Sequence, residues 1–200
     1  MNRQLYKRYF KRTDNVTFPC PSCANLSLKL INDKFFAEYT ALSKKMQADD
    51  DYWEPEWLNS VFTTVLVCNN SDCAESVICS GIRSVDWELK PNEHNEHGEM
   101  EQQYCSFYLP KIFIPTIHFF NIPEKCPDSV NSLLIEAFSL TLQSPGSAAN
   151  KVRAAIENLL TEYGVPRYSR KNGKNNRLTL DSRIAKAKDK NAVLGELMAW

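Results

Sequence analysis

The residues best suited to chemistry in this sequence are two closely spaced pairs of cysteines. Two residues separate Cys20 from Cys23, and four separate Cys68 from Cys73. Two thiolates at such a spacing on a turn can both reach one tetrahedral Zn²⁺, at roughly 2.3 Å. Four thiolates leave no open coordination position for water, so the sequence predicts a structural zinc site made by these cysteines. The alternative is that the four are unrelated reduced cysteines.

Two predicted strands would position the second cysteine pair. Residues 61–67 and 76–79 are rich in β-branched and apolar side chains, and residues 69–72 between them are turn formers. They predict a β-hairpin whose tip carries Cys68 and Cys73. The first pair, in a turn stiffened by prolines, must fold back to join it, as in a zinc ribbon. Because a small sheet buries little apolar area, the metal would supply much of its folding free energy.

Two further groups of residues invite a chemical interpretation. His94 and His97 could form a metal-ligand pair, but no helical periodicity surrounds them, so the polar segment 88–103 is predicted to be an exposed loop. Cys105 and His118 could form a nucleophile pair. Nothing in the sequence places the two together, and a histidine in an aromatic run is usually packed and hydrogen-bonded.

The charges of the chain are segregated although its net charge is zero. Lys and Arg number 24, as do Asp and Glu, yet residues 1–12 carry five basic side chains and no acidic one. The basic, aromatic arm of residues 1–17 could bind nucleic acid through phosphate contacts and base stacking, or dock on its own domain. A second basic segment, residues 165–177, could contact nucleic acid or a partner, or be disordered; its cations are Arg167, Arg170, Lys171, Lys174 and Arg177.

Targeting signals and cysteine usage indicate the compartment. The N-terminus lacks the apolar region of a signal peptide, and no run approaches the roughly 20 apolar residues of a membrane span. We therefore predict a cytoplasmic protein without a membrane segment. An odd number of cysteines, seven, favours thiols and metal over disulfides. The sequence assigns no role beyond packing to Cys79, Cys105 and Cys126.

Helical periodicity marks the C-terminal part of the chain. An apolar stripe over residues 128–143 predicts one helix, and Ser144 with Pro145 ends it and starts a second, which stops at Gly164. These two helices would form an antiparallel hairpin. Shorter helices are predicted at residues 33–48, at about 180–188 and from Asn191 onward.

Several stretches, in combination, are typical of a known family. They are the two cysteine pairs and residues 121–127, 136–138, 144–149, 153–160 and 180–184. On these features the chain resembles, from about residue 18 to its end, bacterial proteins that carry the domain of unknown function 4145. That family is similar to the HEPN superfamily (higher eukaryotes and prokaryotes nucleotide-binding), whose helical bundles often dimerise and include ribonucleases of toxin and phage-defence systems.

The resemblance implies an α+β fold in two parts. Residues 1–122 would form a zinc-ribbon-like antiparallel β region with a basic N-terminal arm. Residues 123–200 would form a HEPN-like helical bundle, which either ends in a short last helix or is incomplete at the C-terminus. Active HEPN ribonucleases carry an arginine followed about four to six residues later by a histidine, which serves as general acid–base. Since no histidine of this chain follows an arginine at that spacing, the sequence favours a non-enzyme.

The expected function is therefore a non-catalytic, zinc-containing binding module. It would engage a protein partner, a second copy of the chain or nucleic acid, in a phage-defence or toxin–antitoxin setting that the resemblance alone supplies. Two alternatives stay open. One is a HEPN-type ribonuclease whose catalytic histidine lies in missing sequence or in a partner. The other is a homodimeric scaffold whose helical stripe is completed by a second copy.

Overall fold

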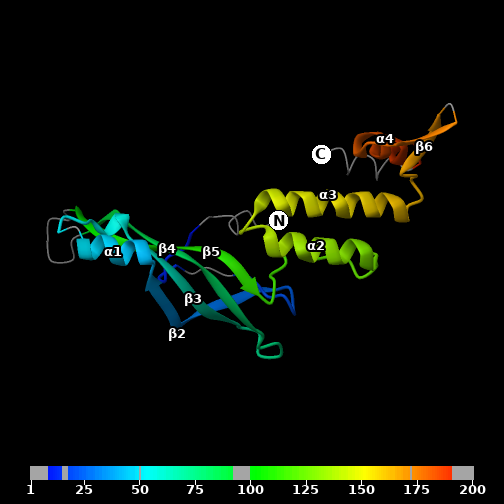
Figure 1. Ribbon diagram of the computed structural model, residues 1–200. Helices are drawn as coiled ribbons and strands as arrows, with labels where there is room; N and C mark the ends of the chain where they lie inside the picture. Colours follow the sequence, from blue (N-terminus) through cyan, green and yellow to red (C-terminus); the bar gives the residue numbers. More distant parts are fainter. Residues whose placement is uncertain (1–8, 15–17, 50, 92–99, 172, 191–200) are drawn as a thin grey trace. The chain divides into compact units, whose positions relative to one another are not determined.

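A computed structural model describes residues 9–14, 18–49, 51–91, 100–171 and 173–190 (Figure 1). The chain divides into two compact units, Met1–Asn121 and Ile122–Trp200. We call them the sheet unit and the helical unit.

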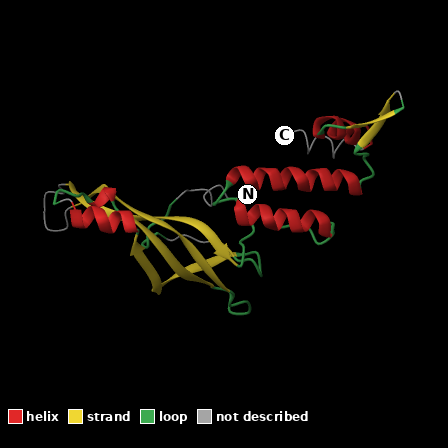
Figure 2. Cartoon of the chain, in the orientation of Figure 1, coloured by secondary structure: helices red, strands yellow, loops and turns green. Residues whose placement is uncertain are grey.

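The sheet unit is built on one curled antiparallel sheet, drawn as yellow arrows in Figure 2. Each strand pairs with the next one along the chain, so the sheet is a meander in the order β1-β2-β3-β4-β5. The strands are β1 (Phe18–Pro19), β2 (Leu26–Tyr39), β3 (Asn59–Cys68), β4 (Ser76–Pro91) and β5 (Met100–Ile114).

Burial alternates strictly from one side chain of β3 to the next, and this identifies the buried face of the sheet. Phe62, Thr64 and Leu66 are buried, whereas the residues between them are exposed or half-buried. Successive side chains of a strand point to opposite faces, and cross-strand partners share a face. Thr64 lies opposite Cys79, which lies opposite Phe113, and these two are buried as well. We call this side the buried face.

Residues 9–14 extend the sheet beyond β5. The backbone N–H of Phe10 donates to the carbonyl of Tyr108 at 2.9 Å, and the N–H of Tyr108 donates back at 2.8 Å. The Phe10 ring is buried and makes edge-on contacts with Phe18 and Phe62. For these residues of the arm, docking on its own domain is confirmed.

A short helical segment connects β2 to β3. It consists of α1 (Ala41–Asp49) and the 3-10 turn η2 (Pro55–Trp57). The buried hydroxyl of Ser43 donates to the carbonyl of Asn59 at 2.9 Å and accepts from its N–H at 2.8 Å, which ties α1 to the start of β3. The helix predicted over residues 33–48 is wrong in its first half, because that part belongs to β2.

The predicted zinc-ribbon-like region is wrong as well. A zinc ribbon has a small sheet that depends on its metal, whereas β2, β4 and β5 are 14, 16 and 15 residues long and enclose an aromatic core. The predicted loop at residues 88–103 is also corrected, because its two ends belong to β4 and β5. His94 and His97 lie outside the described residues.

The helical unit begins with a pair of helices that pack on one another, α2 (Asp128–Leu140) and α3 (Pro145–Glu162). A basic hairpin, β6 (Tyr168–Lys171) with β7 (Lys174–Arg177), leads into α4 (Leu180–Lys190). Pro145 occupies the first turn of α3, as predicted, and Gly164 follows the helix with a positive φ of 70°.

The HEPN-like bundle is not what this unit forms. Instead of running alongside α2 and α3 as a third full-length helix, α4 packs on α3 around a small core of Leu160, Val165 and Ala187. The buried Arg183 holds it there, since its guanidinium donates to the carbonyls of Glu157 and Val165 at 3.0 Å each. The fold class that the resemblance implied is therefore wrong, and the helix predicted from Asn191 lies outside the described residues.

Among the helices of the described chain, none combines the length and the apolar character that crossing a membrane requires.

Candidate metal centre

The structure brings the two cysteine pairs together at one end of the sheet. Cys20 and Cys23 lie on the turn between β1 and β2, Cys68 ends β3, and Cys73 lies on the turn between β3 and β4. All four sulfur atoms lie within 4.8 Å of one another. The cluster could therefore hold a metal ion.

The two turns that carry the cysteines are built alike. In the first, the N–H of Cys20 donates to the carbonyl of Asn25 at 2.8 Å, and Ala24 takes a left-handed conformation with φ of 58°. In the second, the N–H of Cys68 donates to the carbonyl of Glu75 at 2.8 Å, and Ala74 has φ of 46°. In each turn the left-handed alanine directly follows the second cysteine, and this reverses the chain beneath the sulfur atoms.

Sulfur distances within the cluster fit a tetrahedral metal. The Sγ atoms of Cys20 and Cys73 are 3.6 Å apart, and those of Cys23 and Cys68 are 3.7 Å apart. A disulfide needs about 2.05 Å, and all four cysteines are free. Four sulfur atoms at 2.3 Å from a central ion lie roughly 3.8 Å from each other. These two distances are close to that edge length, and no pair of the four sulfur atoms is more than 4.8 Å apart.

The pKa values of the clustered cysteine thiols are shifted in different directions. The pKa of Cys23 is lowered to about 6, chiefly by the backbone hydrogen bond from Asn25. The backbone hydrogen bond from Glu75 also lowers the pKa of Cys73, but burial and the neighbouring thiols outweigh it and raise that pKa to about 12. Burial raises the pKa of Cys20. A bound cation would stabilise all four thiolates at once, because it offsets their mutual repulsion.

Polar residues around the sulfur atoms support the two turns. The hydroxyl of Ser27 lies 2.9 Å from the Cys68 sulfur, where it can donate to a thiolate. Ser22, on the first turn, donates to the carboxylate of Glu75, on the second. Sequence reasoning missed these three residues. Only Ser22, inside the Cys-x-x-Cys spacing, carried a local signal, since the contacts of the other two depend on how β2 and β3 pair.

The basic residues predicted as nucleic-acid or partner contacts lie on the hairpin of the helical unit, except Arg167, which directly precedes it. Arg167 is held against α3 by donating to Thr161 Oγ1 and Asn158 Oδ1, both at 3.0 Å. Arg177 lies 3.5 Å from the carboxylate of Glu157. Arg170 and Lys174 are exposed, and the side chain of Lys171 is outside the described part. The described residues of this segment form the β6–β7 hairpin.

The other cysteines lie outside the cluster. Cys79 is fully buried, and burial raises its pKa to about 12. Cys105 is buried on β5, whereas Cys126 is half-buried just before α2. Burial also lowers the pKa of His118.

Comparison with known proteins corrects the resemblance. The model of the family described as "Domain of unknown function (DUF8608)" matches residues 8–113, more than half of the chain. No curated protein and no solved structure matches the chain. The assignment to domain of unknown function 4145 is wrong, and the HEPN-like, ribonuclease and phage-defence expectations lose the support they had.

The matched segment contains all four clustered cysteines and almost the whole curled sheet, from the described part of the arm to the last residue but one of β5. None of the helical unit falls within it. On this match, the chain belongs to the family of the domain of unknown function DUF8608.

Proposed function

We propose that the sheet unit is a non-catalytic binding module stabilised by one structural Zn²⁺ at Cys20, Cys23, Cys68 and Cys73. The observation that carries this proposal is the spacing of the four sulfur atoms, all within 4.8 Å of one another. Thiolates are soft ligands that favour zinc or iron over calcium and magnesium. A site with four sulfur ligands is closed to water, so its role is structural.

The ion would join two parts of the sheet that are far apart in sequence. Cys20 and Cys23 precede β2, whereas Cys68 and Cys73 flank the turn from β3 to β4. One backbone hydrogen bond already links the turns, from the N–H of Asn69 to the carbonyl of Ser27 at 2.9 Å. Zinc adds a covalent-strength crosslink at that end and fixes how the sheet curls there. A fixed, curled sheet is a suitable platform for binding.

Native mass spectrometry with elemental analysis of the full chain tests the zinc site. We expect one zinc per chain, lost on treatment with a chelator. Cys73→Ser should abolish stoichiometric zinc, whereas the matched control Cys126→Ser, on the helical unit, should keep it. A metal-free protein, an iron-loaded protein, or a Cys73→Ser variant with full zinc would each overturn the assignment.

The same spectra bear on the partner. A protein partner or a second copy of the chain would raise the mass of the intact complex, and a dimer would do so in a concentration-dependent manner. The dimeric scaffold is less favoured than the binding module, because α2 packs on α3 within the chain and its apolar stripe thus has an intramolecular neighbour. We therefore place the binding surface on the sheet unit.

A further inference from the structure

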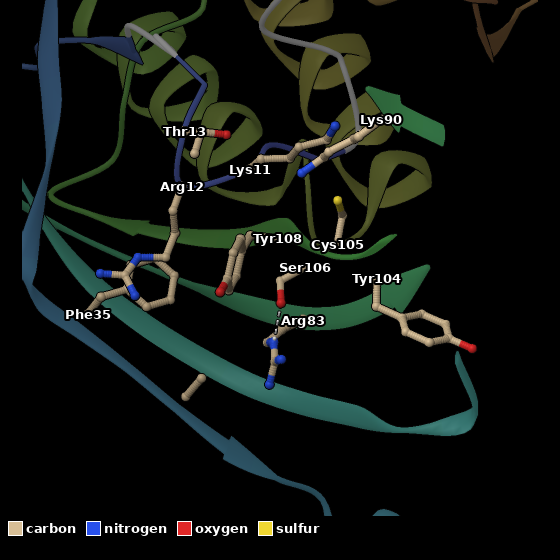
Figure 3. A pocket seen from close by; sticks show the side chains of 11 residues that line it. Lys11, Arg12, Thr13, Phe35, Arg83, Lys90, Tyr104, Cys105, Ser106 and Tyr108 are labelled. Atoms are coloured by element: carbon tan, nitrogen blue, oxygen red, sulfur yellow. Dashed lines mark hydrogen bonds between the residues drawn. The ribbon is translucent and has the colours of Figure 1, made fainter. Parts of the chain in front are cut away.

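A cavity of about 550 Å³ lies on the sheet unit beside residues 9–14 (Figure 3). It is lined from four segments: the arm, β2, β4 and β5. Its volume falls within the roughly 300–1,000 Å³ of ligand sites. The arm reaches it because Phe10 pairs with Tyr108, which places the next residues of the arm over the cavity.

The cavity is positively charged. Among the residues that the structure describes, the lining includes four cations, Lys11, Arg12, Arg83 and Lys90, and no acidic residue. Because the chain as a whole carries no net charge, this concentration of cations is local. Of the four, Lys11 is neutralised by an ion pair with Glu88. A surplus of positive charge is therefore directed at whatever occupies the cavity.

The two guanidinium groups are only partly used by the protein. Arg12 donates one hydrogen bond to the carbonyl of Asn32 at 2.8 Å, and Arg83 donates one to the hydroxyl of Ser106 at 3.1 Å. Over the residues that the structure describes, neither arginine has a carboxylate partner. Since each guanidinium has five N–H donors, both keep donors for an anionic ligand such as phosphate.

Aromatic rings accompany these cations. The Arg12 guanidinium lies 4.9 Å from the centroid of the Phe35 ring, which is itself 4.6 Å from the Tyr108 ring. Tyr104 also lines the cavity and is 53% exposed, so its ring is accessible to solvent and to a ligand. Cationic groups among accessible aromatic rings are what proteins use to hold a nucleic-acid strand, through phosphate contacts and base stacking.

We propose that this cavity binds a nucleotide unit of a single-stranded nucleic acid. Arg12 and Arg83 contact the phosphate, and Tyr104 stacks on the base. The inference rests on the proposed function, because it names the partner of the same binding module. A free nucleotide offers the same phosphate and base chemistry, so the test includes both sources.

Fluorescence anisotropy with the full zinc-loaded chain tests the proposal. The probes are fluorescein-labelled ten-nucleotide strands of deoxythymidine and of uridine, and the competitors are AMP, a DNA duplex and polyglutamate. We expect at least one labelled strand to bind. The other strand, added without label, or AMP should then displace it more effectively than the DNA duplex does. Equal competition by polyglutamate would mean a site for any polyanion, or for an acidic protein, and would overturn the proposal.

Substitutions then locate the site. Arg83→Ala and Arg12→Ala should each weaken binding about tenfold and lower the salt dependence by about 0.7 per lost phosphate contact. Tyr104→Ala should weaken it at least about fivefold. The matched control is Arg153→Ala, an exposed arginine on α3 that does not line the cavity, and it should change nothing. An equal loss in that control, or none in the cavity variants, would contradict the assignment.

Measuring the zinc content of each protein distinguishes failure of the cavity proposal from failure of the zinc assignment. Arg12 is exposed, so its alanine variant should fold and keep its zinc even if Arg83→Ala does not. If the wild-type chain carries zinc but binds none of the strands or nucleotides, the cavity proposal fails while the zinc site stands. If the chain holds no zinc, but the wild type binds a strand and Arg12→Ala weakens that binding, the zinc assignment fails instead.

Discussion

At the scale of single residues, Cys79 shows how burial controls a thiol in this sheet. It is fully buried opposite Thr64 and Phe113, with no charged group among these neighbours. Desolvation disfavours the thiolate, and this is what raises its pKa to about 12. The residue is therefore a small apolar core side chain at neutral pH and is unsuited to act as a nucleophile.

This pKa predicts an alkaline limit to stability. In the unfolded chain a cysteine ionises near pH 8.5–9, whereas folded Cys79 stays protonated up to about pH 12. The contribution of the protonated Cys79 thiol to the stability of the fold is thus complete below about pH 8.5, and it is lost as the pH rises toward 12. We expect the titration of Cys79 to lower the free energy of unfolding by roughly 1.4 kcal/mol per pH unit above pH 9.

Urea unfolding at pH 8 and pH 10 measures this effect. Cys79→Ala should be less stable than the wild type at pH 8, because it leaves a small cavity. Its stability should nevertheless fall less between the two pH values. Parallel losses in the two proteins would show that Cys79 does not titrate as the burial argument requires.

The clustered cysteines were predictable because their signal is local. Spacing within each pair, together with turn-forming neighbours, was enough to nominate all four residues that the structure brings together. Ser27 and Glu75 could not be nominated in this way. Ser27 contacts the Cys68 sulfur, and Glu75 accepts a hydrogen bond from Ser22 on the other turn. Both contacts depend on the pairing of strands that are far apart in sequence, which no short stretch of sequence encodes.

At the scale of elements, β2 shows where periodicity misled the interpretation. Phe36 and Tyr39 are three residues apart, as on one face of a helix, and this favoured a helix over residues 33–48. In the structure Ala37 instead pairs with Phe62 of β3, whose alternating pattern is unambiguous. A strong neighbouring strand thus decided the conformation, which is the usual way that tertiary context overrides a weak local pattern.

A second element-scale feature is the close approach of β4 and β5 at Gly81. The register shifts between Ser80 and Gly81, and a Cβ at Gly81 would overlap the carbonyl oxygen of Leu109. It would also lie 2.9 Å from the Leu109 carbonyl carbon and from a ring carbon of Phe62. Only glycine fits between this backbone and the aromatic core.

Gly81→Ala should therefore destabilise the chain by at least about 2 kcal/mol, since β5 has to move away from β4 to make room. The matched control is Gly146→Ala in the first turn of α3, where an added Cβ meets nothing within 4 Å. That change should be neutral or stabilise by up to about 1 kcal/mol. Urea unfolding of both variants compares them, and equal stabilities would contradict the packing argument.

At the scale of the whole molecule, the helical part was the misleading one. A helix stopped by Ser-Pro and a second one ended by glycine are general signals of a helical hairpin, and the structure does contain α2 and α3. Such signals fix helix boundaries but not how further helices pack, because packing depends on long-range contacts. The family match instead covers residues 8–113, where the clustered cysteines and the cavity lie.

The size of the sheet leads to a prediction about metal removal. A zinc ribbon would unfold without its ion, but this sheet has its own core, in which the Phe62 ring packs against Phe10, Phe35 and Tyr108. Removal of the proposed zinc should therefore loosen only the end of the sheet that carries the cysteines, because a few hydrogen bonds, such as those from Asn69 to Ser27 and from Ser22 to Glu75, are what else joins the two turns.

Hydrogen exchange with and without a chelator distinguishes local from global loosening. Protection should fall in peptides covering residues 18–28 and 68–76, by a factor of ten or more. It should persist in residues 59–66 and 104–113, which pair with β4 from its two sides, and in α2 and α3 of the helical unit. Loss of protection throughout β3, β4 and β5 would mean that the metal, and not the aromatic core, is what stabilises the sheet.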